Sequence, residues 1–206
     1  MLTIGLTGNL GAGKTTVAGM FQKLGAKVLN ADRMAHELIE PNGACFKAVV
    51  RFFGEEILTD GKIDHKKLAR IVFNDSKKLA RLNKIIHPKV IQQISKQLVS
   101  LRAQRSEAKQ SFNIVIEAAL LIESGLHKFV DEIIVVKANR RLQLERILKQ
   151  RGILKQDALQ RLKMQMGIQE KIKFADIVID NRGNLNQTEK QVEEICQRIT
   201  QRNRTN

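Results

Sequence analysis

The residues that most clearly carry chemistry form a glycine-rich run near the amino terminus, Gly8-Asn9-Leu10-Gly11-Ala12-Gly13-Lys14-Thr15. This run fits the pattern G-x-x-x-x-G-K-[ST] at every position. Its glycines let backbone N–H groups face an anion, the Lys14 ammonium can reach the β- and γ-phosphates, and the Thr15 hydroxyl can ligate Mg²⁺. The spacing therefore predicts a nucleotide-phosphate loop, with Lys14 assisting catalysis and Thr16 continuing the binding segment.

Two carboxylates follow short apolar runs and could serve the same chemistry. Asp32 comes just after the run 27–30, where it could orient an attacking hydroxyl and accept its proton. An acid that only complements a helix N-terminus, worth about 0.3–1 kcal/mol, is the alternative. Glu117 ends the run 112–117, where it could hold the hydration shell of Mg²⁺ beside the substrate.

Other polar residues have weaker signals. Arg146 and Arg151 could meet phosphate oxygens bidentately, although most arginines in a basic segment simply face solvent. Asn181 and Arg182 follow the last apolar run and could contact the adenine base, or could form an ordinary turn. His87 precedes a proline and could contact substrate, or could be a partly buried histidine at a helix end.

Five short apolar runs must position these side chains. They span residues 2–7, 27–30, 112–116, 132–136 and 177–179, and helical patterns separate them. Alternation of this kind predicts an α/β fold with a parallel sheet and helices on both faces. From 44 to about 110 the pattern is almost wholly helical, with Asp64 opening one helix and Pro88 ending or kinking another. The last helix carries an apolar face at Val192, Ile195, Cys196 and Ile199.

Charge is distributed unevenly over the 206 residues, whose formal net charge is +15. Segment 61–109 holds 13 basic and 3 acidic residues, and segment 140–173 holds 10 and 3. Both segments lie between predicted strands, so we expect them to be insertions that bind an anionic partner. Cys45 and Cys196 match no metal or disulfide spacing, and no signal or membrane-spanning run is visible. We therefore expect a cytoplasmic protein that does not bind membranes.

Landmarks along the chain fall in the order and at the spacings of one family. They are Gly5-Leu6-Thr7-Gly8, Gly13-Lys14-Thr15, Asn30-Ala31-Asp32, Glu40-Pro41-Asn42-Gly43, His87-Pro88, Leu120-Leu121-Ile122-Glu123, Gln143-Leu144-Glu145-Arg146, Gln165, Ala175-Asp176 and Asp180-Asn181-Arg182-Gly183. The sequence resembles dephospho-CoA kinase over about residues 2–183. The family usually has Asp where this chain has Asn30, and commonly Asp-x-Pro where it has Glu117-Ala118-Ala119.

The resemblance implies transfer of the ATP γ-phosphate to the ribose 3′-hydroxyl of dephospho-CoA, the last step of coenzyme A synthesis. It implies a P-loop kinase core over 1–30, 111–139 and 174–206, a helical acceptor-binding insertion over 31–110, and a lid over 140–173. It also implies that Asp32 is the catalytic aspartate of its motif, with ATP as co-substrate and Mg²⁺ as cofactor. A monomer or weak homo-oligomer is expected.

Two other functions stay open from the residues alone. A kinase for another small acceptor, such as a nucleoside monophosphate or a polyol, would share the same phosphate loop. A nucleic-acid-binding P-loop protein would suit the positive charge, but the chain has 8 Phe and no Trp or Tyr for base stacking. No nucleic acid partner is therefore expected. A GTPase is disfavoured because Asn83-Lys84-Ile85-Ile86 lacks the Asp that specifies guanine.

Overall fold

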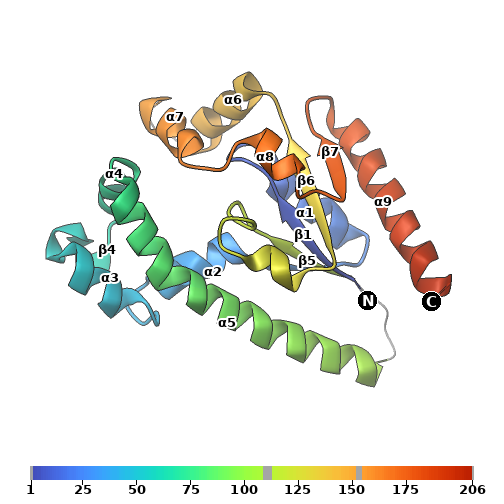
Figure 1. Cartoon of the computed structure of the whole chain (residues 1–206), viewed down its shortest axis with the longest axis horizontal. Helices are drawn as coiled ribbons and strands as arrows, with labels where there is room; N and C mark the ends of the chain where they lie inside the picture. Colours follow the sequence, from blue (N-terminus) through green and yellow to red (C-terminus); the bar gives the residue numbers. More distant parts are fainter. Residues whose placement is uncertain (1, 109–112, 152–154, 206) are drawn as a thin grey trace. The chain divides into compact units, whose positions relative to one another are not determined.

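The computed structural model describes residues 2–108, 113–151 and 155–205, and gives no side-chain description for 105–108, 150–151 and 202–205. The chain divides into two compact units (Figure 1). Unit 1 comprises Met1–Asn30 and Arg105–Asn206, and unit 2 comprises Ala31–Gln104. Segment 140–173, the predicted lid, belongs to unit 1 in this division.

Unit 1 contains a five-stranded sheet in the order β2-β5-β1-β6-β7. Its strands are β1 (Thr3–Thr7), β2 (Lys27–Asn30), β5 (Ile114–Glu117), β6 (Glu132–Lys137) and β7 (Ile177–Asp180). All neighbouring pairs are parallel. Every residue of β1 and β5 is buried, as expected for a parallel sheet flanked by helices. The predicted α/β fold with five parallel strands is confirmed.

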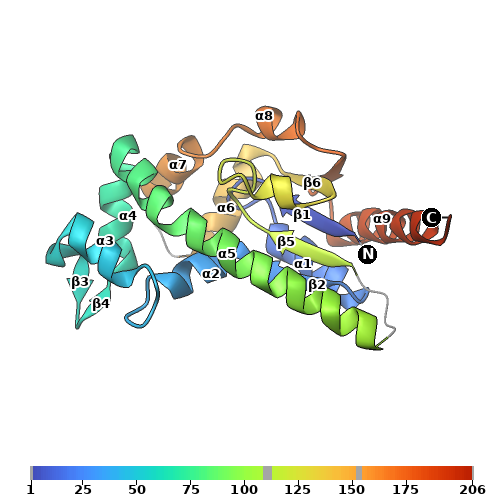
Figure 2. The same ribbon diagram turned by 60° about the horizontal axis from the view of Figure 1, so that its bottom comes forward.

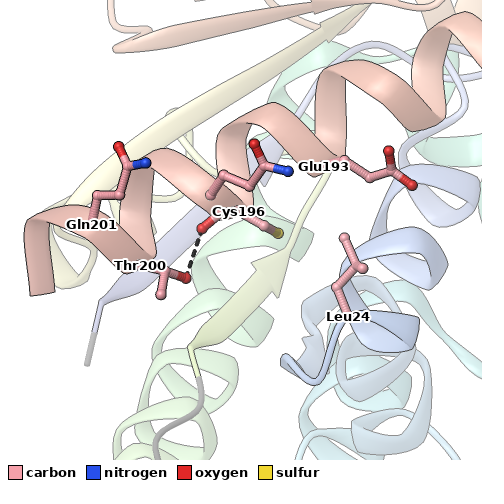
Figure 3. Close-up of a pocket in the computed structure, with 6 residues that line it drawn as sticks. Leu24, Glu193, Cys196, Thr200 and Gln201 are labelled. Atoms are coloured by element: carbon pink, nitrogen blue, oxygen red, sulfur yellow. Dashed lines mark hydrogen bonds between the residues drawn. The ribbon is translucent and has the colours of Figure 1, made fainter. Parts of the chain in front are cut away.

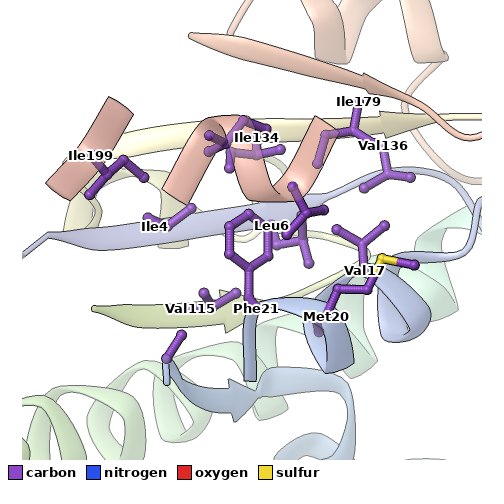
Figure 4. Packing of buried hydrophobic residues seen from close by; sticks show 14 of the residues in the cluster. Ile4, Leu6, Val17, Met20, Phe21, Val115, Ile134, Val136, Ile179 and Ile199 are labelled. Atoms are coloured by element: carbon purple, nitrogen blue, oxygen red, sulfur yellow. The ribbon is translucent and has the colours of Figure 1, made fainter. Parts of the chain in front are cut away.

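Helices of unit 1 accompany this sheet, and the first and last of them pack apolar faces against it. They are α1 (Lys14–Lys23), α6 (Arg140–Arg151), α7 (Lys155–Lys163), α8 (Ile168–Ile172) and α9 (Leu185–Thr205), with a 3₁₀ turn η2 at Leu126–Phe129. Phe21 of α1 and Ile199 of α9 belong to one buried cluster with Ile4 and Leu6 of β1 (Figure 4). The apolar face predicted for the last helix is confirmed, since Val192, Ile195 and Ile199 are buried and Cys196 is partly buried.

Unit 2 is mainly helical. It contains α2 (Ala31–Leu38), α3 (Phe46–Phe53), a 3₁₀ turn η1 (Glu55–Ile57), α4 (His65–Phe73) and most of α5 (Ser76–Ala108). Asp64 caps α4 as predicted, because its carboxylate accepts the backbone N–H groups of Lys66 and Lys67. No helix in the described part of the chain is long and apolar enough to cross a membrane.

One short departure interrupts the almost wholly helical pattern predicted for this region. Strands β3 (Leu58–Thr59) and β4 (Lys62–Ile63) form a hairpin inside the stretch predicted as helical (Figure 2). Asp60 and Gly61 have φ angles of 50° and 73°, so this Asp-Gly pair forms the tight turn that such a pair signals.

Of the two alternatives predicted for Pro88, that it ends or kinks its helix, the first is wrong, because α5 continues through Pro88 to Ala108. A proline removes one backbone hydrogen bond from a helix. Ile86, Val90, Ile94 and Leu98 are nevertheless buried on both sides of Pro88. We attribute the continuity of α5 to this apolar stripe, whose burial offsets the lost bond.

Candidate active site

The phosphate loop predicted from the sequence joins β1 to α1 at the carboxyl end of β1. Gly11 and Gly13 have φ angles of 75° and 94°, in the left-handed region that favours glycine. A Cβ atom on Gly13 would also overlap the side-chain amide of Asn181. These two glycines are therefore required by both backbone conformation and space.

Lys14 begins α1 and is largely buried, with 7% of its surface exposed. Its Nζ donates to the Asn9 carbonyl at 3.4 Å, across the loop that precedes the helix. Thr15 and Thr16 lie exposed in the first turn of α1. The N–H groups of this turn and the positive end of the helix dipole make the loop suited to an anion such as phosphate.

Glu117, at the end of β5, connects the loop to the neighbouring strand. Its Oε1 accepts the Thr15 hydroxyl at 2.6 Å, and its Oε2 accepts the Asn30 amide at 2.8 Å. Only 3% of Glu117 is exposed. Asn30 ends β2 and lies opposite Glu117 in the sheet. Both carboxylate oxygens are thus satisfied, which is how a buried carboxylate is stabilised.

The same group of atoms fits a magnesium ion chemically. Thr15 offers a hydroxyl oxygen at the loop, and the Glu117 carboxylate accepts from that hydroxyl. Mg²⁺ prefers oxygen ligands and usually keeps several waters beside one or two protein groups and substrate phosphates. The described residues contain no cluster of three His, Cys, Asp or Glu side chains suited to a metal, so an all-protein cage is not indicated within them.

Arg146 of α6 lies against the phosphate loop. Its guanidinium donates to the Gly11 carbonyl at 3.5 Å and to the Ala12 carbonyl at 3.3 Å. Its other terminal nitrogen donates to the Asn181 carbonyl at 3.4 Å. One cationic side chain therefore contacts both the loop and the segment that follows β7, within reach of an anion bound there.

Asn181 is also committed to the loop. Its Nδ2 donates to the Ala12 carbonyl at 2.8 Å, and its Oδ1 accepts the Thr188 hydroxyl at 2.9 Å. Asn181 is 4% exposed. The residue predicted to contact adenine thus holds the loop in place, and a contact with the base stays a prediction.

Arg182 is exposed and bonds to the carboxylate of Asp180. Hydrogen bonds from Arg182, together with Lys137 at 3.5 Å, lower the pKa of Asp180 to about 2. The pair orders the turn after β7, at the same sheet edge as the phosphate loop.

Comparison with known proteins shows which family the chain belongs to. A family model described as dephospho-CoA kinase matches residues 2–187. The chain belongs to the dephospho-CoA kinase family. It is 43% identical over 201 residues to a dephospho-CoA kinase of Aquifex aeolicus (strain VF5), covering 97% of this chain and 98% of that one.

Solved structures agree with this assignment. The crystal structure of TT1252 from Thermus thermophilus superposes with a TM-score of 0.77 at 29% identity, covering 96% of this chain and 97% of that one. Dephospho-CoA kinase from Campylobacter jejuni superposes with a TM-score of 0.67 at 28% identity, covering 98% of both chains. The resemblance inferred from the sequence is confirmed over almost the whole chain.

The predicted site residues of this dephospho-CoA kinase family member divide between the two units. Unit 1 brings together the loop Gly8–Thr16, Glu117, Arg146 and Asn181. Asp32 is exposed in the first turn of α2, and His87 is half-buried within α5, both in unit 2. The side chain of Arg151 lies outside the described residues.

Several residues around the loop were missed by the functional reasoning from the sequence. Gln165 accepts the Leu10 N–H at 2.9 Å, and the buried Lys171 bonds to Glu123. Glu123 and Gln165 were landmarks of the family resemblance, but neither had an assigned role. Nothing in the sequence pattern distinguishes Lys171 from the other cations of its basic segment.

A surface pocket of unit 1 is unrelated to this site. It is lined by Leu24 at the end of α1 and by residues of α9, among them Glu193, Cys196 and Thr200 (Figure 3). No residue of the phosphate loop lines it. Burial and the nearby Glu193 raise the pKa of Cys196 to about 11, so its thiol is unreactive at neutral pH. Cys45 and Cys196 are both free thiols in the structure.

Proposed function

We propose that this family member transfers the γ-phosphoryl group of ATP to the ribose 3′-hydroxyl of dephospho-CoA, with ATP held at the carboxyl edge of the unit 1 sheet. One observation carries the proposal most directly. The phosphate loop, Glu117 and Arg146 gather around the N-terminus of α1 through hydrogen bonds between segments far apart in sequence. Catalysis of phosphoryl transfer depends on such positioning and charge neutralisation.

ATP is held by the loop residues. The N–H groups at the start of α1 cradle its phosphates, and Lys14 moves from the Asn9 carbonyl to phosphate oxygen. Arg146 exchanges its bonds with carbonyls of the loop for stronger, charge-assisted bonds to phosphate. Asn181 stays on the Ala12 carbonyl and keeps the loop in shape.

Thr15 would bind Mg²⁺ through its hydroxyl, and Glu117 would hold the metal's water ligands. When bound, Mg²⁺ neutralises charge on the transferring phosphoryl group. The Asn30 amide donates to Glu117 and keeps its carboxylate oriented. Asn30 itself brings no negative charge to the metal.

Asp32 is the proposed general base toward the attacking hydroxyl. It lies two residues beyond Asn30, so covalent geometry alone keeps its Cα within about 7 Å of the Asn30 Cα. Its side chain is exposed in the first turn of α2 and therefore accessible to an acceptor. A carboxylate positioned in this way contributes about 10²–10⁴-fold to the rate of a proton transfer.

The basic segments complete the proposal. Residues 31–110 would bind dephospho-CoA, with His87 among the contacts, and residues 140–173 would close over ATP as a lid. Arg151 and Arg182 would add positive charge beside the nucleotide. A cytoplasmic location, a monomeric or weakly oligomeric state and the absence of a nucleic acid partner stay predictions.

The deciding experiment measures ADP release by a coupled assay over a panel of acceptors. The panel contains dephospho-CoA, nucleoside monophosphates and small polyols, and phosphorus NMR locates the new phosphate. We expect turnover on dephospho-CoA with the phosphate on the ribose 3′-oxygen. Preference for another acceptor would reassign the substrate. Binding to nucleic acid without acceptor-dependent ADP release would replace the kinase activity itself.

A further inference from the structure

Lys171, in α8, is completely buried. Its Nζ donates to both carboxylate oxygens of Glu123 at 2.9 Å and to the Ala119 carbonyl at 2.8 Å. All three donors of the ammonium are therefore used. A lysine is almost never fully buried unless it is paired, and here Lys171 loses its hydration while the Glu123 side chain stays 21% exposed, so the pair contributes little net stability. The pair therefore calls for an explanation other than stability.

The partners of Glu123 lead to the phosphate loop. The Glu123 Oε1 that binds Lys171 also accepts the backbone N–H of Met166 at 3.1 Å. The Met166 carbonyl in turn accepts the side-chain amide of Asn9 at 3.1 Å. The neighbouring Gln165 accepts the backbone N–H of Leu10 at 2.9 Å. Residues 164–167, which we call the strap, thus bond to Glu123 and to two successive residues of the loop.

The same network returns to the start of the loop. The Ala119 carbonyl that accepts from Lys171 also accepts the Thr7 hydroxyl at 3.4 Å. Thr7 ends β1 and directly precedes Gly8. Lys171 is therefore joined through hydrogen bonds to the loop by two routes, one through Glu123 and the strap, the other through Ala119 and Thr7. Every residue of both routes belongs to unit 1.

We propose that Lys171 and Glu123 are positioning residues for ATP, which hold the strap on Asn9 and Leu10 and so keep the phosphate loop in its binding shape. The ion pair with the buried Lys171 fixes Glu123, Glu123 fixes Met166, and the strap fixes the loop. Neither Lys171 nor Glu123 needs to touch the nucleotide. The inference rests on the proposed binding of ATP at this loop. Loss of the pair then weakens ATP binding and leaves dephospho-CoA binding unchanged.

The test is steady-state kinetics of Lys171→Met, at a temperature where circular dichroism shows the variant folded. We expect the KM for ATP to rise about 10- to 100-fold, because small displacements of positioning groups carry effects of that size. The KM for dephospho-CoA should stay within about twofold, and Lys171→Arg, which keeps the charge, should recover part of the loss. Equal changes in both KM values, or an unchanged ATP KM, would overturn the proposal.

Lys173→Met is the matched control. Lys173 lies in the turn after α8 and pairs with Glu170 at 2.7 Å, but 68% of its side chain is exposed. In the described part of the chain its side chain bonds to Glu170 and not to the strap or the loop, so its removal should leave both KM values unchanged. If Lys173→Met raised the ATP KM as much as Lys171→Met does, the effect would come from the loss of positive charge in general. The positioning role of the Lys171–Glu123 pair would then be rejected.

Gln165→Leu tests the route through the strap. It removes the contact with Leu10 and leaves the Lys171–Glu123 pair in place. It should raise the ATP KM without affecting the dephospho-CoA KM. In the double variant Gln165→Leu/Lys171→Met, the two increases should not multiply, because both act on one chain of contacts. Full multiplication would show that Lys171 acts independently of the strap.

Lys171→Met leaves the Glu123 carboxylate without its cation and could prevent folding. The charge-neutral variant Lys171→Met/Glu123→Gln avoids that outcome, and it should still show the raised ATP KM. A folded double variant with the wild-type ATP KM would reject the proposal. Lys14→Ala, measured in parallel, separates a failure of the proposed ATP site from a failure of the proposed positioning role. If Lys14→Ala leaves ATP use intact, the proposed ATP site fails; if only the Lys171 variants leave it intact, the positioning role fails.

Discussion

The two units of the molecule bury different kinds of side chain. Within the described residues, every buried polar or charged side chain belongs to unit 1, among them Asn9, Lys14, Glu117, Lys171 and Asn181. The buried side chains of unit 2 are all apolar. Burying a polar group costs free energy unless it is hydrogen-bonded, so unit 1 carries a cost that unit 2 avoids.

This difference is consistent with the separate tasks that we propose for the two units. The polar groups of unit 1 bond to one another across segments more than one hundred residues apart, as Thr15 and Glu117 do. Such bonds fix the positions of groups that must meet phosphate. In unit 2 the apolar stripe of α5 supplies the core, while charged residues such as Lys77, Lys84 and Lys96 stay exposed. Exposed cations are available to an anionic acceptor without disturbing the fold.

The largest effect is expected for a residue of unit 2, the proposed general base Asp32. Asp32→Asn removes a proton acceptor from an exposed position and should lower kcat about 10²–10⁴-fold with little change in thermal stability. Asp60→Asn, in the exposed hairpin turn, is the control. A kcat for Asp32→Asn within tenfold of wild type would show the base assignment to be wrong and would confine the chemistry to unit 1.

The next effect tests the buried lysine of the phosphate loop in unit 1. Lys14→Ala should lower kcat/KM about 10²–10³-fold, since a preorganised cationic donor to the transferring group is lost. Lys23→Ala, in the last turn of the same helix and exposed, should change nothing. Kinetics combined with far-ultraviolet circular dichroism checks that α1 remains folded. Equal losses in the two variants would contradict the special position of Lys14.

A change in the core of unit 2 should have the opposite signature. Ile94→Ala removes a side chain that is 1% exposed, and should lower the free energy of unfolding by about 2–5 kcal/mol. Val99→Ala, on the same helix at 67% exposure, should be nearly neutral. Urea denaturation measures both, and kcat at low temperature should be unchanged in each. A stable Ile94→Ala variant would contradict the description of α5 as the core of this unit.

The smallest expected effect concerns an exposed pair at the sheet edge of unit 1. The pKa of Asp180 falls from 3.8 to about 2 through Arg182, so the pair stabilises the fold above about pH 4 and this contribution is lost as pH falls toward 2. Asp180→Asn should lower the Tm by at most about 2–4 °C at neutral pH, because both partners are partly exposed. The difference between wild type and variant should shrink below pH 4. A Tm difference that stays constant at all pH values would show that the substitution acts through the geometry of the turn and not through the charge.

Local patterns predicted most of the elements. The alternation of apolar runs and helical segments gave the strands, and Asp64 marked the start of α4 by a rule that needs only its neighbours. The hairpin at Asp60-Gly61 carried an equally local turn signal, which the helical pattern around it obscured. Pro88 shows the limit of such rules, because the burial of the stripe around it decides whether α5 continues.

The sequence by itself determined the phosphate loop, because its glycines, lysine and threonine act within one short segment, and the landmarks spread over residues 2–183 indicated the family. Only the tertiary structure decided the partners of that loop. The strand order places β5 between β2 and β1, so Glu117 meets Asn30 and Thr15, and the packing of α8 brings the buried Lys171 to Glu123. Which side chains are buried, and which distant residues bond to one another, depends on how segments far apart in the sequence pack together, and local residue spacing does not determine that packing.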